Sequence, residues 1–104
     1  MSKTLDLAKE LISLKSVTPN DAGCQEIVAK RLKQFGFNIE NLNFGDVKNL
    51  WAILGDSGPI FAFLGHTDVV PPGPIDQWES DPFCPTEKKE LLVGRGSADM
   101  KGSV

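Results

Sequence analysis

Apolar residues recur at helical spacing in the first third of the chain. From Thr4 to Leu14, leucine, alanine and isoleucine side chains repeat three or four positions apart, which is typical of a helix with one apolar face. Thr4 is a candidate cap, and Pro19 ends the pattern because the residue before a proline avoids the helical region. A second apolar face runs from Asp21 to Phe35, and Gly36 follows it, where a helix commonly ends in a left-handed residue. The pattern therefore predicts two amphipathic helices.

Short apolar runs bounded by glycine follow the helices. Phe37–Phe44 alternates between apolar and polar residues with one slip in phase, and Asn49–Leu54 follows a turn, so both are predicted strands. Ile60–Leu64 is apolar at every position, which is typical of a central strand with both faces covered. Leu91–Val93 is predicted to return from a charged hairpin turn at Glu87–Glu90. Helices followed by a buried strand indicate an α/β fold, a layered sheet with covering helices.

Proline and glycine dominate the segment after the apolar run. Pro71–Pro74 cannot join the interior of a sheet, because proline lacks the N–H that pairs with a neighbouring strand. Trp78 and Phe83 are the aromatic residues of this irregular segment. Two interpretations stay open: the rings pin a long loop onto the body of the protein, or they form a wall of a substrate cleft.

Composition indicates one small globular domain. The chain has 104 residues, 40% of them hydrophobic, and a formal net charge of −3 with both signs well mixed. No basic cluster predicts a nucleic-acid or membrane surface, and no apolar run approaches the roughly 20 residues of a membrane span. The N-terminus lacks the features of a secretory signal, so we expect a cytoplasmic protein. Cys24 and Cys84 are expected to be reduced thiols, with a structural disulfide as the alternative.

His66, the single histidine of the chain, is a candidate metal ligand. Asp68 stands two positions later, and side chains two apart on an extended backbone point to the same side. Neutral imidazole is a common zinc ligand, and a carboxylate on its other ring nitrogen fixes the tautomer. The alternative is a surface histidine held by ordinary hydrogen bonds, because a His-x-Asp pair alone is a weak signal.

Asp99 is a second candidate ligand. It follows a predicted strand and the turn Gly94–Gly96, and ligand sites in open α/β sheets lie beyond the carboxyl ends of strands, where His66 also stands. We therefore expect His66, Asp68 and Asp99 to converge at one rim of a sheet, with ligand atoms about 4–5 Å apart around a zinc ion. The alternative role of Asp99 is to cap a helix that begins at Met100.

Several separated motifs resemble one known family. The segments GHTDVVPPG, DPF-P and GRGSADMKGS stand in the order found in the M20 family of metal-dependent amidohydrolases, and the N-terminal helices and SVTP turn also look like that family. The resemblance implies a zinc-peptidase-like catalytic domain that binds two zinc ions, with cobalt as a possible substitute. By resemblance, His66 binds one zinc and Asp99 bridges both. Asp68 is assigned a catalytic role, in which it orients His66.

The resemblance also implies an activity. Members of the family hydrolyse an amide between an acyl group and an amino acid, and the VVPPG and GRGSADMKGS wording favours N-succinyl-diaminopimelate, which yields succinate and diaminopimelate for lysine and cell-wall precursor synthesis. Acetylornithine deacetylases and carboxypeptidases share the His-x-Asp and ADMKG elements and are the alternatives. The expected partners are the small-molecule substrate and a second copy in a homodimer, with no nucleic acid and no membrane.

Members of this family are several times longer than this chain. Residues 1–104 are therefore expected to be the N-terminal part of the catalytic domain. The general-base glutamate, the remaining metal ligands and the dimerisation domain are expected beyond Val104. Alone, the chain is predicted to be inactive and to bind zinc weakly. The alternative from another class is a non-catalytic fragment or binding module.

Overall fold

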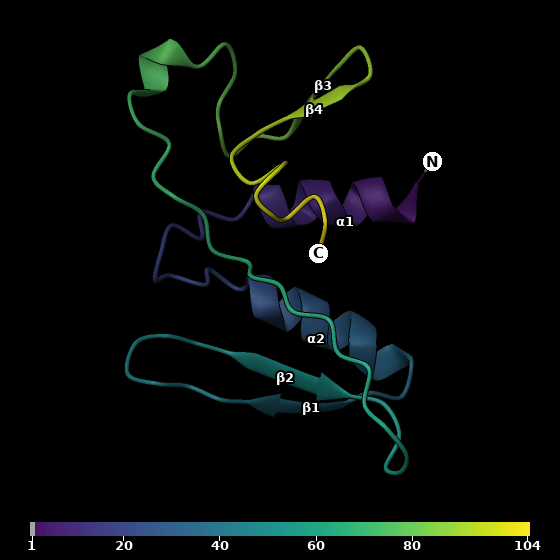
Figure 1. The fold of residues 1–104 in the computed structure, drawn as a ribbon. Coiled ribbons are helices and arrows are strands. Elements are labelled where there is room, and N and C mark those ends of the chain that lie inside the picture. Colours follow the sequence, from purple (N-terminus) through teal and green to yellow (C-terminus); the bar gives the residue numbers. More distant parts are fainter. Residues whose placement is uncertain (1) are drawn as a thin grey trace.

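The computed structural model describes residues 2–104, whose arrangement is shown in Figure 1. Helices α1 (Lys3–Ile12) and α2 (Cys24–Gln34) come first, followed by the antiparallel pair β1 (Asn38–Asn41) and β2 (Leu50–Ile53). The short 3-10 helix η1 (Ile75–Gln77) precedes a second antiparallel pair, β3 (Thr86–Lys88) and β4 (Leu91–Val93). The chain is therefore a small α/β structure, as predicted, and its described strands form two separate two-stranded sheets.

Both predicted helices are confirmed, but their first residues differ from the prediction. Ser2, not Thr4, caps α1, since its side-chain oxygen accepts a hydrogen bond from the Leu5 N–H at 3.2 Å. The second helix starts later than predicted because Ala22 and Gly23 take left-handed backbone angles, with φ of 54° and 90°. Periodicity thus located the helices, whereas local backbone and side-chain chemistry set where they begin.

The β1–β2 pair contacts α2, and Figure 1 shows the hairpin running beside that helix. Asn38 lies opposite Ile53 in a regular antiparallel register. The strands are shorter than the predicted runs Phe37–Phe44 and Asn49–Leu54, although a bridge between Phe44 and Val47 extends the pairing toward the turn. The strand predicted at Leu91–Val93 is confirmed as β4, which pairs with β3.

The predicted central strand at Ile60–Leu64 is wrong for this structure. The segment is irregular, and Phe61, Phe63 and Leu64 are 84%, 92% and 97% exposed. A strand needs a neighbour whose backbone groups pair with its own, and within residues 2–104 no segment pairs with this one. The apolar pattern indicates that these side chains favour burial, but it does not indicate which segment would cover them. For the same reason, a single layered sheet covered by helices is not formed by the described residues.

A small core forms where α1 meets later parts of the chain. Its buried apolar residues are Ala8, Leu11, Ile12, Cys24 and Val69. Two glycines lie against this core. A Cβ atom at Gly94 would stand 2.7 Å from Ile12 Cγ2, and one at Gly96 would stand 2.9 Å from Val69 Cγ1. The turn after β4 is therefore pressed directly onto α1 and onto the segment that contains Val69.

Trp78 and Phe83 hold the proline-rich loop onto the body of the protein. The indole N–H of Trp78 donates to the Pro72 carbonyl at 2.9 Å, and the Arg95 guanidinium lies 5.1 Å from the Trp78 ring centre. The Lys15 ammonium lies 5.9 Å from the centre of the Phe83 ring. These contacts agree with the interpretation in which the two rings pin the loop.

The two cysteines are free thiols in different surroundings. Cys24 is buried in the core and Cys84 is exposed, so the alternative of a disulfide between them is not found. Burial raises the pKa of the Cys24 thiol, against the opposing effects of Ser16 and Lys101. Across residues 2–104, neither helix has the length and apolar character needed to cross a membrane.

Candidate metal centre

The turn after α1 pairs with the segment that follows His66. Val17 and Val69 form a parallel bridge. The Val69 N–H donates to the Ser16 carbonyl at 2.9 Å, and the Thr18 N–H donates to the Val69 carbonyl at 3.1 Å. The residues between the first helix and the proline therefore fix the backbone that carries the candidate histidine.

His66 lies between the carboxylates of Asp68 and Asp99. Its Nδ1 is 3.2 Å from Asp68 Oδ1 and 3.0 Å from the Asp68 carbonyl oxygen, and its Nε2 is 3.1 Å from Asp99 Oδ1. The His66 backbone N–H also donates to Met100 Sδ at 3.3 Å, next to Asp99 in sequence. The three candidate residues therefore converge, but irregular segments bring them together and the predicted rim of a sheet is wrong.

The Asp99 side chain is 84% exposed and stands in a run of turns after β4. The alternative in which it caps a helix finds no support, because no helix follows Asp99 in the described part of the chain, which continues to residue 104 as turns. The Asp99 side chain is instead directed to His66.

Both ring nitrogens of His66 face hydrogen-bond acceptors. A neutral imidazole has one N–H, so it donates to only one of Asp68 and Asp99. The arrangement therefore favours either an imidazolium ion or a cation bound between Nε2 and Asp99. Partial desolvation lowers the pKa of His66, but the hydrogen bond to the Asp68 carbonyl and the charges of both carboxylates outweigh it. The pKa is consequently raised above its ordinary value of 6.5.

These donor atoms suit part of a zinc site. Imidazole nitrogen and carboxylate oxygen are ordinary zinc ligands, and two ligands of a tetrahedral zinc lie about 3.3 Å apart when their bonds are about 2.0–2.1 Å long. The 3.1 Å between His66 Nε2 and Asp99 Oδ1 is close to that distance. The predicted separation of about 4–5 Å is therefore wrong, since it exceeds the spacing of two ligands on one tetrahedral ion. Since Asp68 faces the opposite ring nitrogen, the three do not surround one point, and residues 2–104 contain no group of three or more side chains arranged to hold a metal ion. The described residues therefore offer two ligand groups for one ion, His66 Nε2 and the Asp99 carboxylate.

Thr18 is a contact of the site that sequence reasoning missed. Its hydroxyl donates to Asp68 Oδ2, while Asp68 Oδ1 faces His66, so the carboxylate is held from both sides. In the sequence, Thr18 is visible only as part of the turn that ends a helical pattern. No spacing rule connects residues that stand 50 positions apart, so only the fold reveals this contact.

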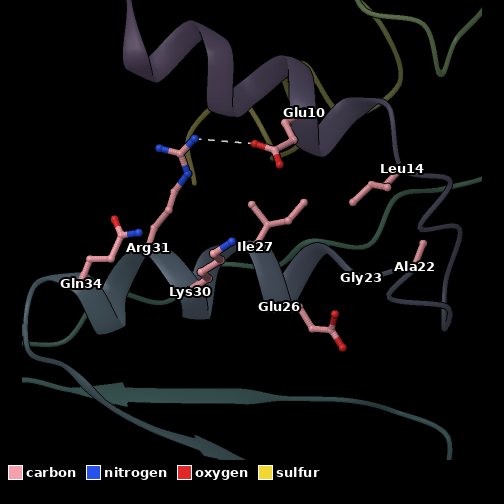
Figure 2. Close-up of a pocket in the computed structure, with 9 residues that line it drawn as sticks. All are labelled: Glu10, Leu14, Ala22, Gly23, Glu26, Ile27, Lys30, Arg31 and Gln34. Carbon is pink, nitrogen blue, oxygen red and sulfur yellow. Dashed lines mark ion pairs between the residues drawn. The ribbon is translucent and has the colours of Figure 1, made fainter.

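A groove of about 630 Å³ lies between α1 and α2, away from these residues. Figure 2 shows Glu10 and Arg31 facing one another from the two helices, where they form an ion pair of 3.6 Å. None of His66, Asp68 and Asp99 lines the groove. The groove is therefore separate from the candidate metal centre.

Comparison with known proteins supports the resemblance to this family. The profile of peptidase family M20/M25/M40 matches residues 62–104, a segment that contains His66, Asp68 and Asp99. We refer to residues 62–104 as the M20 segment, after the family whose profile they match. The resemblance that the separated motifs suggest is therefore confirmed, and all three candidate residues lie in the M20 segment.

Relatives named succinyl-diaminopimelate desuccinylase align with the whole chain, including the part before the M20 segment. Those of Methylococcus capsulatus, Alkalilimnicola ehrlichii and Methylobacillus flagellatus are 61%, 60% and 60% identical over 104 residues, which is 100% of this chain. The chain spans 28% of the length of each of these relatives. The similarity therefore extends from the first helix to the turn that carries Asp99.

Proposed function

We propose that the protein carrying this chain is a zinc-dependent amidohydrolase that converts N-succinyl-diaminopimelate to succinate and diaminopimelate. The similarity of the whole chain to proteins named desuccinylase supports the choice of substrate. The observation that carries the metal-dependent chemistry is His66, whose two ring nitrogens both face carboxylates inside an M20 segment. A cation at Nε2 resolves the conflict between two acceptors and one N–H.

Each residue of the site has a distinct task in this proposal. His66 Nε2 and the Asp99 carboxylate would hold a zinc ion, and Asp99 would also serve as a ligand for a second ion. Asp68 accepts the Nδ1–H bond, which leaves Nε2 unprotonated and turned toward Asp99. Thr18 fixes Asp68 in turn. When bound, zinc supplies Lewis acidity and lowers the pKa of a water molecule to about 7.

Residues 1–104 form part of the catalytic domain in this proposal. The general base, the remaining metal ligands and a dimerisation domain belong to sequence outside this chain, and the complete protein is a cytoplasmic homodimer. Two observations support this division: the chain spans 28% of the length of its relatives, and its described residues offer an incomplete ligand set. Residues 1–104 alone are accordingly expected to be inactive.

Parallel assays on two substrates test the proposal. We expect the complete protein with zinc to release succinate from N-succinyl-diaminopimelate far faster than acetate from N-acetylornithine, and a chelator to abolish both rates until zinc or cobalt is restored. Asp99→Asn should lower kcat/KM by roughly 100-fold or more, because even residues that only orient a metal ligand contribute about 10–100-fold. Asp56→Asn, at an exposed turn, is the matched control.

Two outcomes would contradict this function. Preferential hydrolysis of the acetylated substrate would place the protein among the deacetylases of the same family. Absence of hydrolysis on both substrates, with zinc bound, would favour a non-catalytic binding protein.

A further inference from the structure

Lys101 is a lysine in a place where apolar side chains usually lie. The residue is 1% exposed, and its Nζ donates hydrogen bonds to the carbonyl oxygens of Leu11 at 2.7 Å and Leu14 at 2.9 Å. Lysine is rarely buried, because its ammonium ion loses hydration. The two carbonyls offset part of that loss, and they lie at the end of α1, where the helix dipole favours a positive charge.

The backbone beside Lys101 forms a closed turn. The Gly102 N–H donates to the Gly96 carbonyl at 3.3 Å. A Cβ atom at Gly96 would stand 2.9 Å from Val69 Cγ1 and 3.1 Å from Lys101 Cδ, so the turn packs tightly on both groups. Gly96 therefore packs against the aliphatic part of Lys101, and the turn rests on Val69, three residues after the candidate histidine.

Asp99 stands inside this turn with little else to position it. Its side chain is 84% exposed, and within residues 2–104 its carboxylate makes a hydrogen bond only to His66. An exposed side chain on a loop loses conformational entropy when it is fixed, so its position depends on how firmly the backbone beneath it is held. The anchor of that backbone is the buried Lys101, two residues further along.

We propose that Lys101 is a positioning residue: its ammonium group anchors the turn 96–102 to the end of α1 and so holds the Asp99 carboxylate opposite His66 Nε2. The inference rests on the proposed function for the identity of the ion, zinc. A methionine has similar length and would fill the same space without burying a charge. It would also leave the Leu11 and Leu14 carbonyls without this donor, which is the difference that the experiment uses.

The test compares Lys101→Met and Lys101→Gln with Lys88→Met in the complete, metal-free protein. Lys88, at the end of β3, pairs with the exposed Glu79, so its variant controls for the loss of one lysine. Zinc chloride alone is titrated by calorimetry, and backbone amide hydrogen exchange is followed in the same samples. We expect both Lys101 variants to bind zinc about 10–100-fold more weakly. The Gly102 N–H should exchange faster, while exchange in the β1–β2 pair stays at the wild-type rate. Lys88→Met should change neither quantity.

Three results would overturn the inference. The first is a folded Lys101→Met protein with wild-type zinc affinity and wild-type Gly102 exchange. The second is faster Gly102 exchange with unchanged zinc affinity, which would mean that the turn is anchored without consequence for Asp99. The third is general loss of amide protection in both variants, β1–β2 included, which would assign Lys101 to overall stability. Neither readout uses the substrate, so failure of the proposed hydrolysis remains separate from failure of this inference.

Discussion

His66 is shared between two carboxylates, and this arrangement decides how its charge responds to pH and metal. Because Asp68 and Asp99 together stabilise the imidazolium ion, protons and zinc compete for the same ring. Zinc affinity is therefore expected to fall as the pH falls through the pKa of His66. The same two contacts hold the ring of this half-exposed histidine in one orientation.

The pKa of His66 in the metal-free chain is the first quantity to measure. We expect it above 6.5, and lower in Asp99→Asn, because that change removes a charge 3.1 Å from Nε2. Since folding raises this pKa, the histidine contributes stability that is fully present below its unfolded value of about 6.5. That contribution is lost as the pH rises through the folded pKa. An NMR titration of the ring C–H signals measures the pKa of His66 directly. An unchanged pKa in Asp99→Asn would show that the carboxylate does not lie at Nε2.

Among individual residues, sequence spacing was informative only over short distances. His66 and Asp68 stand two positions apart, so an extended backbone is enough to bring them together. Thr18 and Lys101 make contacts across 50 and 90 positions, respectively, and no local pattern marks them. The position of Asp99 after a strand and a glycine turn indicates a candidate ligand, whereas its contact with His66 depends on how that turn packs.

Helices and hairpins were predictable because they complete their hydrogen bonds locally. Both α1 and α2 show their apolar faces in the sequence, and β4 returns to β3 through a two-residue turn. Ile60–Leu64 depends instead on a partner strand that an apolar pattern does not specify. The prediction of a layered sheet is therefore wrong at Ile60–Leu64, the element whose pairing is not local.

The turn after β4 is the element whose packing matters most for the site. Gly96 has φ of 94°, and a Cβ atom there would stand 2.9 Å from Val69 Cγ1. We expect Gly96→Ala to lower the free energy of unfolding by about 2–5 kcal/mol, from left-handed strain of about 1–2 kcal/mol and overpacking of about 1–3 kcal/mol. Gly45→Ala is the control, because Gly45 has φ of 62° and nothing within 4 Å.

Urea denaturation of both glycine variants separates the two effects. The control should lose only the strain, about 1–2 kcal/mol. Equal losses in the two variants would show that the turn does not press on Val69.

The described residues together leave a continuous apolar segment in solvent. Ile60, Phe61, Phe63 and Leu64 are between 69% and 97% exposed, which is unusual for neighbouring large side chains. Such segments commonly mark surfaces that other parts of a protein cover. The chain spans 28% of the length of its relatives, and we expect this segment to be covered in proteins of that full length.

Phe63→Ala tests that expectation in two lengths of the protein. In the complete protein the substitution should lower the free energy of unfolding by about 3–5 kcal/mol, the usual effect of truncating a buried phenylalanine. In residues 1–104 alone the effect should be close to zero, because Phe63 is 92% exposed. Denaturant unfolding measures both. A negligible effect in the complete protein would mean that the segment stays exposed there.

Anomalous scattering at the zinc edge, from crystals of the complete protein grown with zinc, locates the ion itself. The proposed site predicts a zinc peak about 2.0–2.2 Å from both His66 Nε2 and an Asp99 carboxylate oxygen, with Asp68 on the opposite ring nitrogen. The peak should disappear in His66→Ala crystals. Zinc bound elsewhere, or a direct His66–Asp99 hydrogen bond that persists at saturating zinc, would contradict the assignment of these residues as metal ligands.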